Sequence, residues 1–100
     1  MRRAVRALAQ PGSPTRRNVK AREQARKVLR QDYLARGARP QDADRKVAER
    51  ETKIRRRAAL GIRQRHLKEG LVQGEGGYRI NRDEAMMLRE FDMGHGILRD

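Results

Sequence analysis

Apolar residues recur with the period of an α-helix through the middle of the chain, over residues 42–70. They form a single narrow stripe, and charged residues cover the other faces. The pattern predicts one long helix that must pack against a neighbour, because a thin stripe buries little apolar surface. The stripe consists of Ala43, Val47, Ile54, Ala58 and Ile62.

A second helical pattern precedes it, over about residues 17–36. Asn18 is placed to cap its start, and Gly37 is placed to end it in a left-handed conformation. Because the connection to the long helix is short, we predict an antiparallel helical hairpin with the two apolar stripes facing each other. The stripe of this helix consists of Ala21, Ala25, Val28, Leu29 and Tyr33.

After Gly70 the pattern changes. Two β-prone runs, 71–73 and 78–80, flank a glycine-rich turn and predict a β-hairpin. Asn81 and Glu84 then have the spacing of a capping box, which predicts a helix over about residues 82–93. Met87, Leu88 and Phe91 share one face of that helix.

The predicted fold is therefore mainly α: an antiparallel pair of long basic helices, a short Gly-turn β-hairpin, a C-terminal amphipathic helix and an extended N-terminal arm. One hundred residues suffice for one small domain. We divide the chain into a flexible basic arm (1–16), a basic helical hairpin (17–70) and a docking segment made of the β-hairpin and the last helix (71–100). A Pro-Gly-Ser-Pro break ends the arm.

Charge sharpens this picture, since the chain carries a formal net charge of +13. The first acidic residue is Glu23, and residues 53–68 contain basic residues without an acid. Arginine outnumbers lysine, and arginine favours bidentate contacts with phosphate, although a GC-rich genome also raises the arginine content. We predict nucleic-acid contacts, mainly from the second half of the long helix. The predicted contact residues are Arg2, Arg3, Arg6, Arg16, Arg17, Lys53, Arg55, Arg56, Arg57, Arg63, Arg65 and Lys68.

Residues 71–100 differ from the basic front because they are slightly acidic and contain most of the large apolar side chains. We expect this segment to bind a protein partner, with Phe91 or Leu88 facing inward. The predicted partner-binding residues are Met86, Met93, Ile97 and Leu98.

The run LKEGLV (67–72), followed by GGYRI (76–80), resembles the end of a winged helix-turn-helix domain, in which the recognition helix leads into a glycine-tipped wing. The resemblance covers only residues 58–80. The space between Gly61 and Gly70 is shorter than the recognition helix of that family, so we do not assign the chain to it. The resemblance implies phosphate contacts from Arg79 and Arg82.

Catalysis, cofactors and metal sites find no support in the sequence. It has no cysteine, its only serine is Ser13 in the Pro-Gly break, and His66 and His95 fall on different elements. No apolar run approaches the ~18 residues that a membrane span needs. We predict a protein that is not an enzyme and binds no cofactor or metal.

Together these patterns predict a non-catalytic nucleic-acid-binding protein, a small accessory subunit of a ribonucleoprotein such as a ribosome, with RNA favoured over DNA. One alternative is a DNA-binding protein of winged-helix-like, phage, plasmid or nucleoid type. Another is a structural interaction subunit of a protein assembly. The arginine-rich, acid-free N-terminus fits both a mitochondrial transit peptide and a binding arm, so the mitochondrial matrix is one of the intracellular locations left open.

Overall fold

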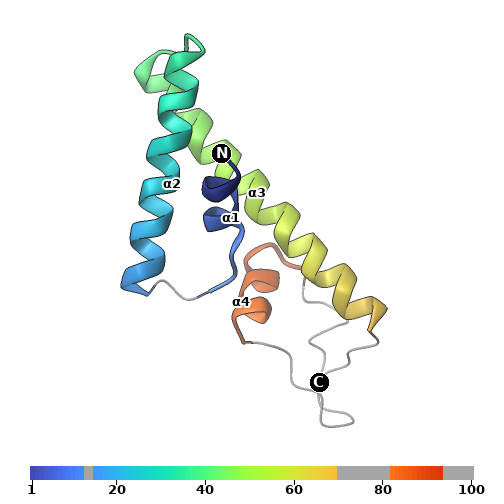
Figure 1. Cartoon of the computed structure of the whole chain (residues 1–100). Coiled ribbons are helices and arrows are strands. Elements are labelled where there is room, and N and C mark those ends of the chain that lie inside the picture. Colours follow the sequence, from blue (N-terminus) through green and yellow to red (C-terminus); the bar gives the residue numbers. More distant parts are fainter. Residues whose placement is uncertain (13–14, 70–81, 94–100) are drawn as a thin grey trace. The chain divides into compact units, whose positions relative to one another are not determined.

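The computed structural model describes residues 1–12, 15–69 and 82–93. The described part is helical and contains no strand, which confirms the mainly α prediction (Figure 1). The predicted β-hairpin lies outside the described residues. The four helices are α1 (Arg2–Ala9), α2 (Arg16–Ala35), α3 (Pro40–Lys68) and α4 (Arg82–Glu90).

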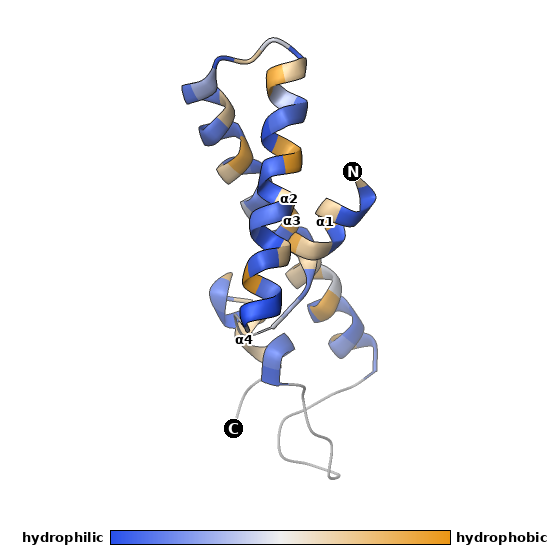
Figure 2. Cartoon of the chain, turned by 60° about the vertical axis from the view of Figure 1, so that its left-hand side comes forward, coloured by the Kyte–Doolittle hydropathy of each residue, from blue (hydrophilic) through white to orange (hydrophobic). Residues whose placement is uncertain are grey.

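The chain divides into two compact units that cut across the predicted segments. The N-terminal unit consists of Met1–Gln10 and Pro14–Arg55, and the C-terminal unit of Pro11–Ser13 and Arg56–Asp100. The boundary falls within α3, so this helix contributes to both units. Most positions along α2 and α3 are hydrophilic, and their apolar positions recur at intervals (Figure 2). Each unit is described separately below.

The ends of α2 follow from local hydrogen bonding. Thr15, and not the predicted Asn18, is the N-cap, because its Oγ1 accepts the backbone N–H of Asn18 at 3.2 Å. Gly37 ends the helix with φ +96°, as predicted. The N–H of Gly37 donates to Leu34 and that of Ala38 to Tyr33, the paired bonds of a Schellman motif.

The antiparallel helical hairpin is confirmed for α2 and the first half of α3. Arg30 Nε donates to Asp44 Oδ1 at 2.8 Å, near the connection between the helices. Further from it, Arg26 forms two parallel hydrogen bonds with Glu51, at 2.8 and 2.7 Å. With increasing distance from the connection, residue numbers therefore fall along α2 and rise along α3, which makes the two helices antiparallel.

The core of the N-terminal unit is built by three helices and not by two. The predicted stripe of α2 is wrong at Ala21 and Val28, which are exposed, because burial follows four-residue steps along this helix. The partly buried side chains of Ala7, Tyr33 and Ile54 pack around the cluster of buried residues that forms this core. The buried residues are Ala4 and Leu8 of α1, Ala25 and Leu29 of α2, and Val47 of α3.

The prediction of an extended N-terminal arm is wrong for Arg2–Ala9, which forms α1. Ala4 and Leu8 are four residues apart and share one helical face, and Leu8 is 0% exposed. The stripes of α2 and α3 are too narrow to complete a core, so a leucine from a third helix stabilises the unit. The segment is rich in arginine and contains no acidic residue, a composition that favoured a disordered arm over the helix that the spacing of Ala4 and Leu8 indicates.

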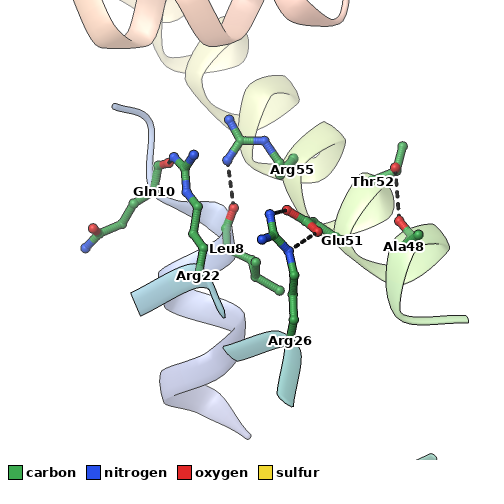
Figure 3. A network of polar contacts seen from close by, with 8 residues as sticks. All are labelled: Leu8, Gln10, Arg22, Arg26, Ala48, Glu51, Thr52 and Arg55. Carbon is green, nitrogen blue, oxygen red and sulfur yellow. Dashed lines mark hydrogen bonds and ion pairs between the residues drawn. The ribbon is translucent and has the colours of Figure 1, made fainter. Parts of the chain in front are cut away.

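Two arginines hold the end of α1 in place (Figure 3). Arg55 Nη1, from α3, donates to the backbone carbonyl of Leu8 at 3.0 Å. Arg22 Nη2, from α2, donates to the carbonyl of Gln10 at 3.2 Å. The last carbonyls of a helix lack intrahelical donors, so these guanidinium groups supply the missing hydrogen bonds.

In the C-terminal unit, the second half of α3 packs against α4. Ala58, Phe91 and Met93 are partly buried around the cluster. The structure confirms that Leu88 faces inward, as it is 0% exposed. The buried residues are Ala59 and Ile62 of α3 with Met87 and Leu88 of α4.

Met93 is partly buried and packs against the core of the C-terminal unit, and its predicted contact with a partner stays a prediction. The helix ends at Glu90, earlier than expected. Asp92 adopts φ 55°, and the N–H of Met93 donates to the carbonyl of Leu88 at 2.8 Å. This is a second Schellman motif, in which Met93, just beyond the helix end, bonds back to Leu88 in the last turn of α4. The sequence conceals it because an aspartate, and not a glycine, takes the left-handed conformation.

The resemblance to a winged helix-turn-helix fails in the described residues. That motif needs a turn before its recognition helix, near Gly61. Instead, α3 is continuous from Pro40 to Lys68.

Candidate nucleic-acid interface

The arginines of the second half of α3 are largely engaged in holding the fold. Arg55 donates to a carbonyl of α1, as described above. Arg65 forms an ion pair with Glu84 of α4. The guanidinium of Arg56 lies over the ring of Phe91, 5.8 Å from its centroid. These contacts reduce what this stretch offers to an external phosphate.

The remaining predicted residues of α3 differ in accessibility. Arg63 is half-buried, and its Nε atom is enclosed without a hydrogen-bond partner in the described structure. Lys53, Arg57 and Lys68 are exposed. Because Arg55, Arg56 and Arg65 already contact other parts of the chain, these three residues form a sparse set.

The predicted basic residues of α1 and of the start of α2 are arranged differently. All five are exposed, and none forms an ion pair with another residue in the described parts of the chain. No acid precedes Glu23 in the sequence, so no neighbouring carboxylate of this segment reduces their charge. The five are Arg2, Arg3, Arg6, Arg16 and Arg17.

The start of α2 adds to the positive potential. Its first turn contains Arg16 and Arg17 and no acidic residue. The N-terminus of a helix carries the positive end of the helix dipole, where acids are stabilising and cations are not. An external anion would relieve this repulsion.

A groove lies between α1 and α2 and has a volume of about 180 Å³. Three guanidinium groups line it, and no acidic side chain does. A groove between α2 and α3, of about 290 Å³, contrasts with it because Asp44 and Glu51 line that one and pair with its arginines. The α1–α2 groove is lined by Arg3, Arg6, Ala7, Gln10, Asn18, Ala21 and Arg22.

The C-terminal unit contains a buried titratable group that the sequence analysis did not single out. His66 is 0% exposed, and neither ring nitrogen has a hydrogen-bond partner among the described residues. Its Nε2 lies 3.5 Å from Glu84, whose carboxylate also pairs with Arg65. Burial, together with the charge of Arg65, lowers the pKa of His66, although Glu69 acts in the opposite direction. The signal was present, since His66 continues the four-residue steps that lead to Ile62.

This histidine forms no metal centre with its neighbours. Across residues 1–12, 15–69 and 82–93, no three potential ligands among His, Cys, Asp and Glu gather closely enough to hold an ion. The enclosed imidazole packs beside a carboxylate that Arg65 already pairs.

No protein-family model, curated protein or solved structure matches this chain. Its function must therefore be argued from charge and geometry. The helices that the structure describes include none with the length and hydrophobicity that a membrane crossing requires.

Two of the predicted partner-binding residues, Met86 and Met93, lie in the part of the chain that the structure describes. Met86 is 43% exposed on α4. Leu60 and Leu67, on the second half of α3, are also exposed, at 42% and 56%. Met93 is partly buried against the core, and residues 97 and 98 lie outside the described ranges.

Proposed function

We propose that this chain is a non-catalytic nucleic-acid-binding protein that contacts the phosphate backbone mainly through α1 and the start of α2. The proposal is supported by the five exposed arginines at the N-terminus. The segment that carries them contains no acidic residue before Glu23, and its helices pack into the core of the N-terminal unit. Arginine matches phosphate with two parallel hydrogen bonds, and neutralising phosphates releases condensed counterions.

The aromatic residues favour backbone contacts over base stacking. Aromatic side chains make up only 3% of the sequence. Lys46 lies over the ring of Tyr33 at 5.9 Å, and Arg56 over that of Phe91 at 5.8 Å. Base-stacking modules need open aromatic faces. Within the described residues, both aromatic rings already carry a cation, which favours recognition of groove shape and phosphate position.

Within this class, we propose a small accessory subunit of a ribonucleoprotein such as a ribosome, with RNA favoured over DNA. A small, basic, helical chain with separate basic and apolar regions has the general build of such subunits. DNA binding of the phage, plasmid or nucleoid type is the alternative, because phosphate recognition by itself does not distinguish the two polymers.

A protein partner is the second part of the proposal. Met86, Leu60 and Leu67 expose apolar surface on the C-terminal unit, and Asp83, Glu84 and Glu90 place acids on α4. This unit would bind protein more readily than phosphate. The same residues favour the alternative of a structural interaction subunit.

Fluorescence anisotropy with three labelled probes tests the proposal: a structured RNA hairpin, a DNA duplex and polyglutamate. We expect the RNA to bind most tightly. The logarithm of its affinity should fall with the logarithm of salt concentration with a slope of about −3 to −5, as four or five phosphate contacts require. Polyglutamate binding that equals RNA binding in 0.2 M salt would instead identify a general polyanion or acidic-protein ligand.

A further inference from the structure

We infer that the groove between α1 and α2 seats a single backbone phosphate, held by Arg3 and Arg6 of α1, while Arg22 of α2, which donates to Gln10, adds its positive charge to the groove. This inference rests on the proposed function and assigns its contact point. A bound phosphodiester would lie between the helices rather than against one exposed face.

The packing of α1 explains why the groove exists. Ala4 and Leu8 face the core, which places Arg3 and Arg6 beside the first turns of α2. Ala7 and Ala21 line the groove with one methyl group each, so the space between the helices stays open.

The groove is preorganised by hydrogen bonds. Arg22 donates to the carbonyl of Gln10, which ties α2 to the end of α1 (Figure 3). Arg55 holds the preceding turn through Leu8. The arginines of α1 are therefore presented on an anchored helix, and ordering them on binding costs less than ordering a free arm.

The positive charge of the groove favours a bound anion. Three guanidinium groups line it without an acid. Glu51 lines the other groove, between α2 and α3, and its pKa is lowered chiefly by its hydrogen bond to Arg26 and least by the charge of Arg22. Glu51 is thus committed to Arg26, and the positive end of α2 adds to the field.

The size of the groove selects a small anionic group. Its volume of about 180 Å³ is below the roughly 300–1,000 Å³ of pockets that enclose drug-sized ligands. A phosphate group fits such a space, and none of the residues that line the groove is aromatic, so it offers no ring on which a base could stack. The groove should therefore bind the backbone without reading the base.

Two matched pairs of variants test the inference, with the RNA hairpin as the probe in 0.1 M salt. The first pair compares Arg3→Gln/Arg6→Gln with Arg16→Gln/Arg17→Gln, which remove the same charge inside and outside the groove. We expect the groove variant to bind about ten-fold more weakly and the control about three-fold more weakly, because only the first loses the contacts with the phosphate that is seated in the groove.

The second pair leaves every charge in place. Ala21→Leu fills this groove, and Ala48→Leu fills the groove between α2 and α3. Both alanines are exposed on helices and leucine is a good helix former, so circular dichroism should show that both variants fold. We expect weaker RNA binding only for Ala21→Leu, and the same order of effects with the DNA duplex.

The outcomes separate the two proposals. If the wild-type protein binds RNA with steep salt dependence but Ala21→Leu binds equally well, the groove is not the contact and only the general proposal stands. Equal losses for the two arginine pairs would also overturn the groove. If the wild-type protein binds neither RNA nor DNA in a salt-dependent way, the proposed function itself is wrong.

Discussion

The two acid-free basic stretches of this protein look alike in sequence and differ in structure. In α3, Arg55 and Arg65 contact a carbonyl and a carboxylate of the chain itself, and Arg56 covers an aromatic ring. At the N-terminus, the arginines of α1 and of the first turn of α2 are exposed. A charge is available to a ligand only where the fold does not already use it.

This difference reverses the order that composition suggests. The second half of α3 has the denser run of arginines and was expected to be the main contact. Its arginines satisfy the helix end of α1 and the carboxylate of α4, so the fold depends on them. The N-terminal stretch is the better candidate because its apolar residues, and not its arginines, attach it to the core.

The largest effect should follow from removing the anchor of α1. Leu8→Ala deletes a side chain that is 0% exposed in the core of the N-terminal unit. We expect a loss of about 2–4 kcal/mol in the free energy of unfolding, from lost burial and the cavity left behind. Urea unfolding followed by circular dichroism measures it. Val19→Ala is the control, because Val19 is 38% exposed on α2, and a loss for Leu8 no larger than for this control would mean that α1 is not part of the core.

Acidic pH should destabilise the C-terminal unit through His66. Its pKa is lowered in the folded state, so the unfolded chain binds a proton at a pH where the folded chain does not. Stability is unaffected above the ordinary value of 6.5 and falls below it, by up to about 1.4 kcal/mol per pH unit until the folded pKa is reached. Unfolding measured at several pH values should show this loss in the wild-type protein and not in His66→Gln. A stability that rises as the pH falls through this range would contradict the burial argument.

A smaller effect is expected from the pair that joins α2 to α3. Glu51→Gln removes the two-point contact with Arg26 and should cost about 1 kcal/mol. Since Arg26 lowers the pKa of Glu51, this contribution is present above the ordinary value of 4.5 and is lost as the pH falls through the lower folded value. Glu49→Gln is the matched control, as its partner Arg45 lies on the same helix and both side chains are about 60% exposed. Equal losses for the two variants would show that the hairpin pair has no special role.

The smallest effect should be a gain. Gly61 lies inside α3, and nothing lies within 4 Å of where a Cβ would be placed. Gly61→Ala should stabilise the protein by about 0.5–1 kcal/mol, because alanine loses less backbone freedom in a helix. A turn at this position, as a helix-turn-helix needs, would make the same change destabilising, so the melting temperature decides between the two.

Much of the fold could be predicted because helical spacing is a local signal. The stripe of α3 from Ala43 to Ile62 is buried or partly buried as expected, and Gly37 ends α2. The helix over Arg2–Ala9 was missed because α1 depends on a tertiary contact, the packing of Leu8 against residues of α2 and α3. The end of the last helix was misplaced because Asp92 turns the chain where a glycine was expected.

The candidate site was harder to predict than the fold. Sequence shows where arginines lie along a helix, but not which of them a carbonyl or carboxylate from another helix occupies. Arg55 and Arg57 look equivalent in the sequence, and only the structure separates the one bonded to Leu8 from the exposed one. The groove could not be predicted either, because it needs the docking of α1.

The salt dependence of RNA binding tests the central claim most directly, in two variants that each lose five charges. One changes Arg2, Arg3, Arg6, Arg16 and Arg17 to Gln. The other changes Lys53, Arg56, Arg57, Arg63 and Lys68 to Gln and keeps the contacts of Arg55 and Arg65. We predict that the first variant reduces the slope of log affinity against log salt by about 3–4, one phosphate contact accounting for roughly 0.9, and that the second reduces it by about 1 or less. A larger reduction of the slope for the second variant than for the first would contradict this account and place the main interface on α3.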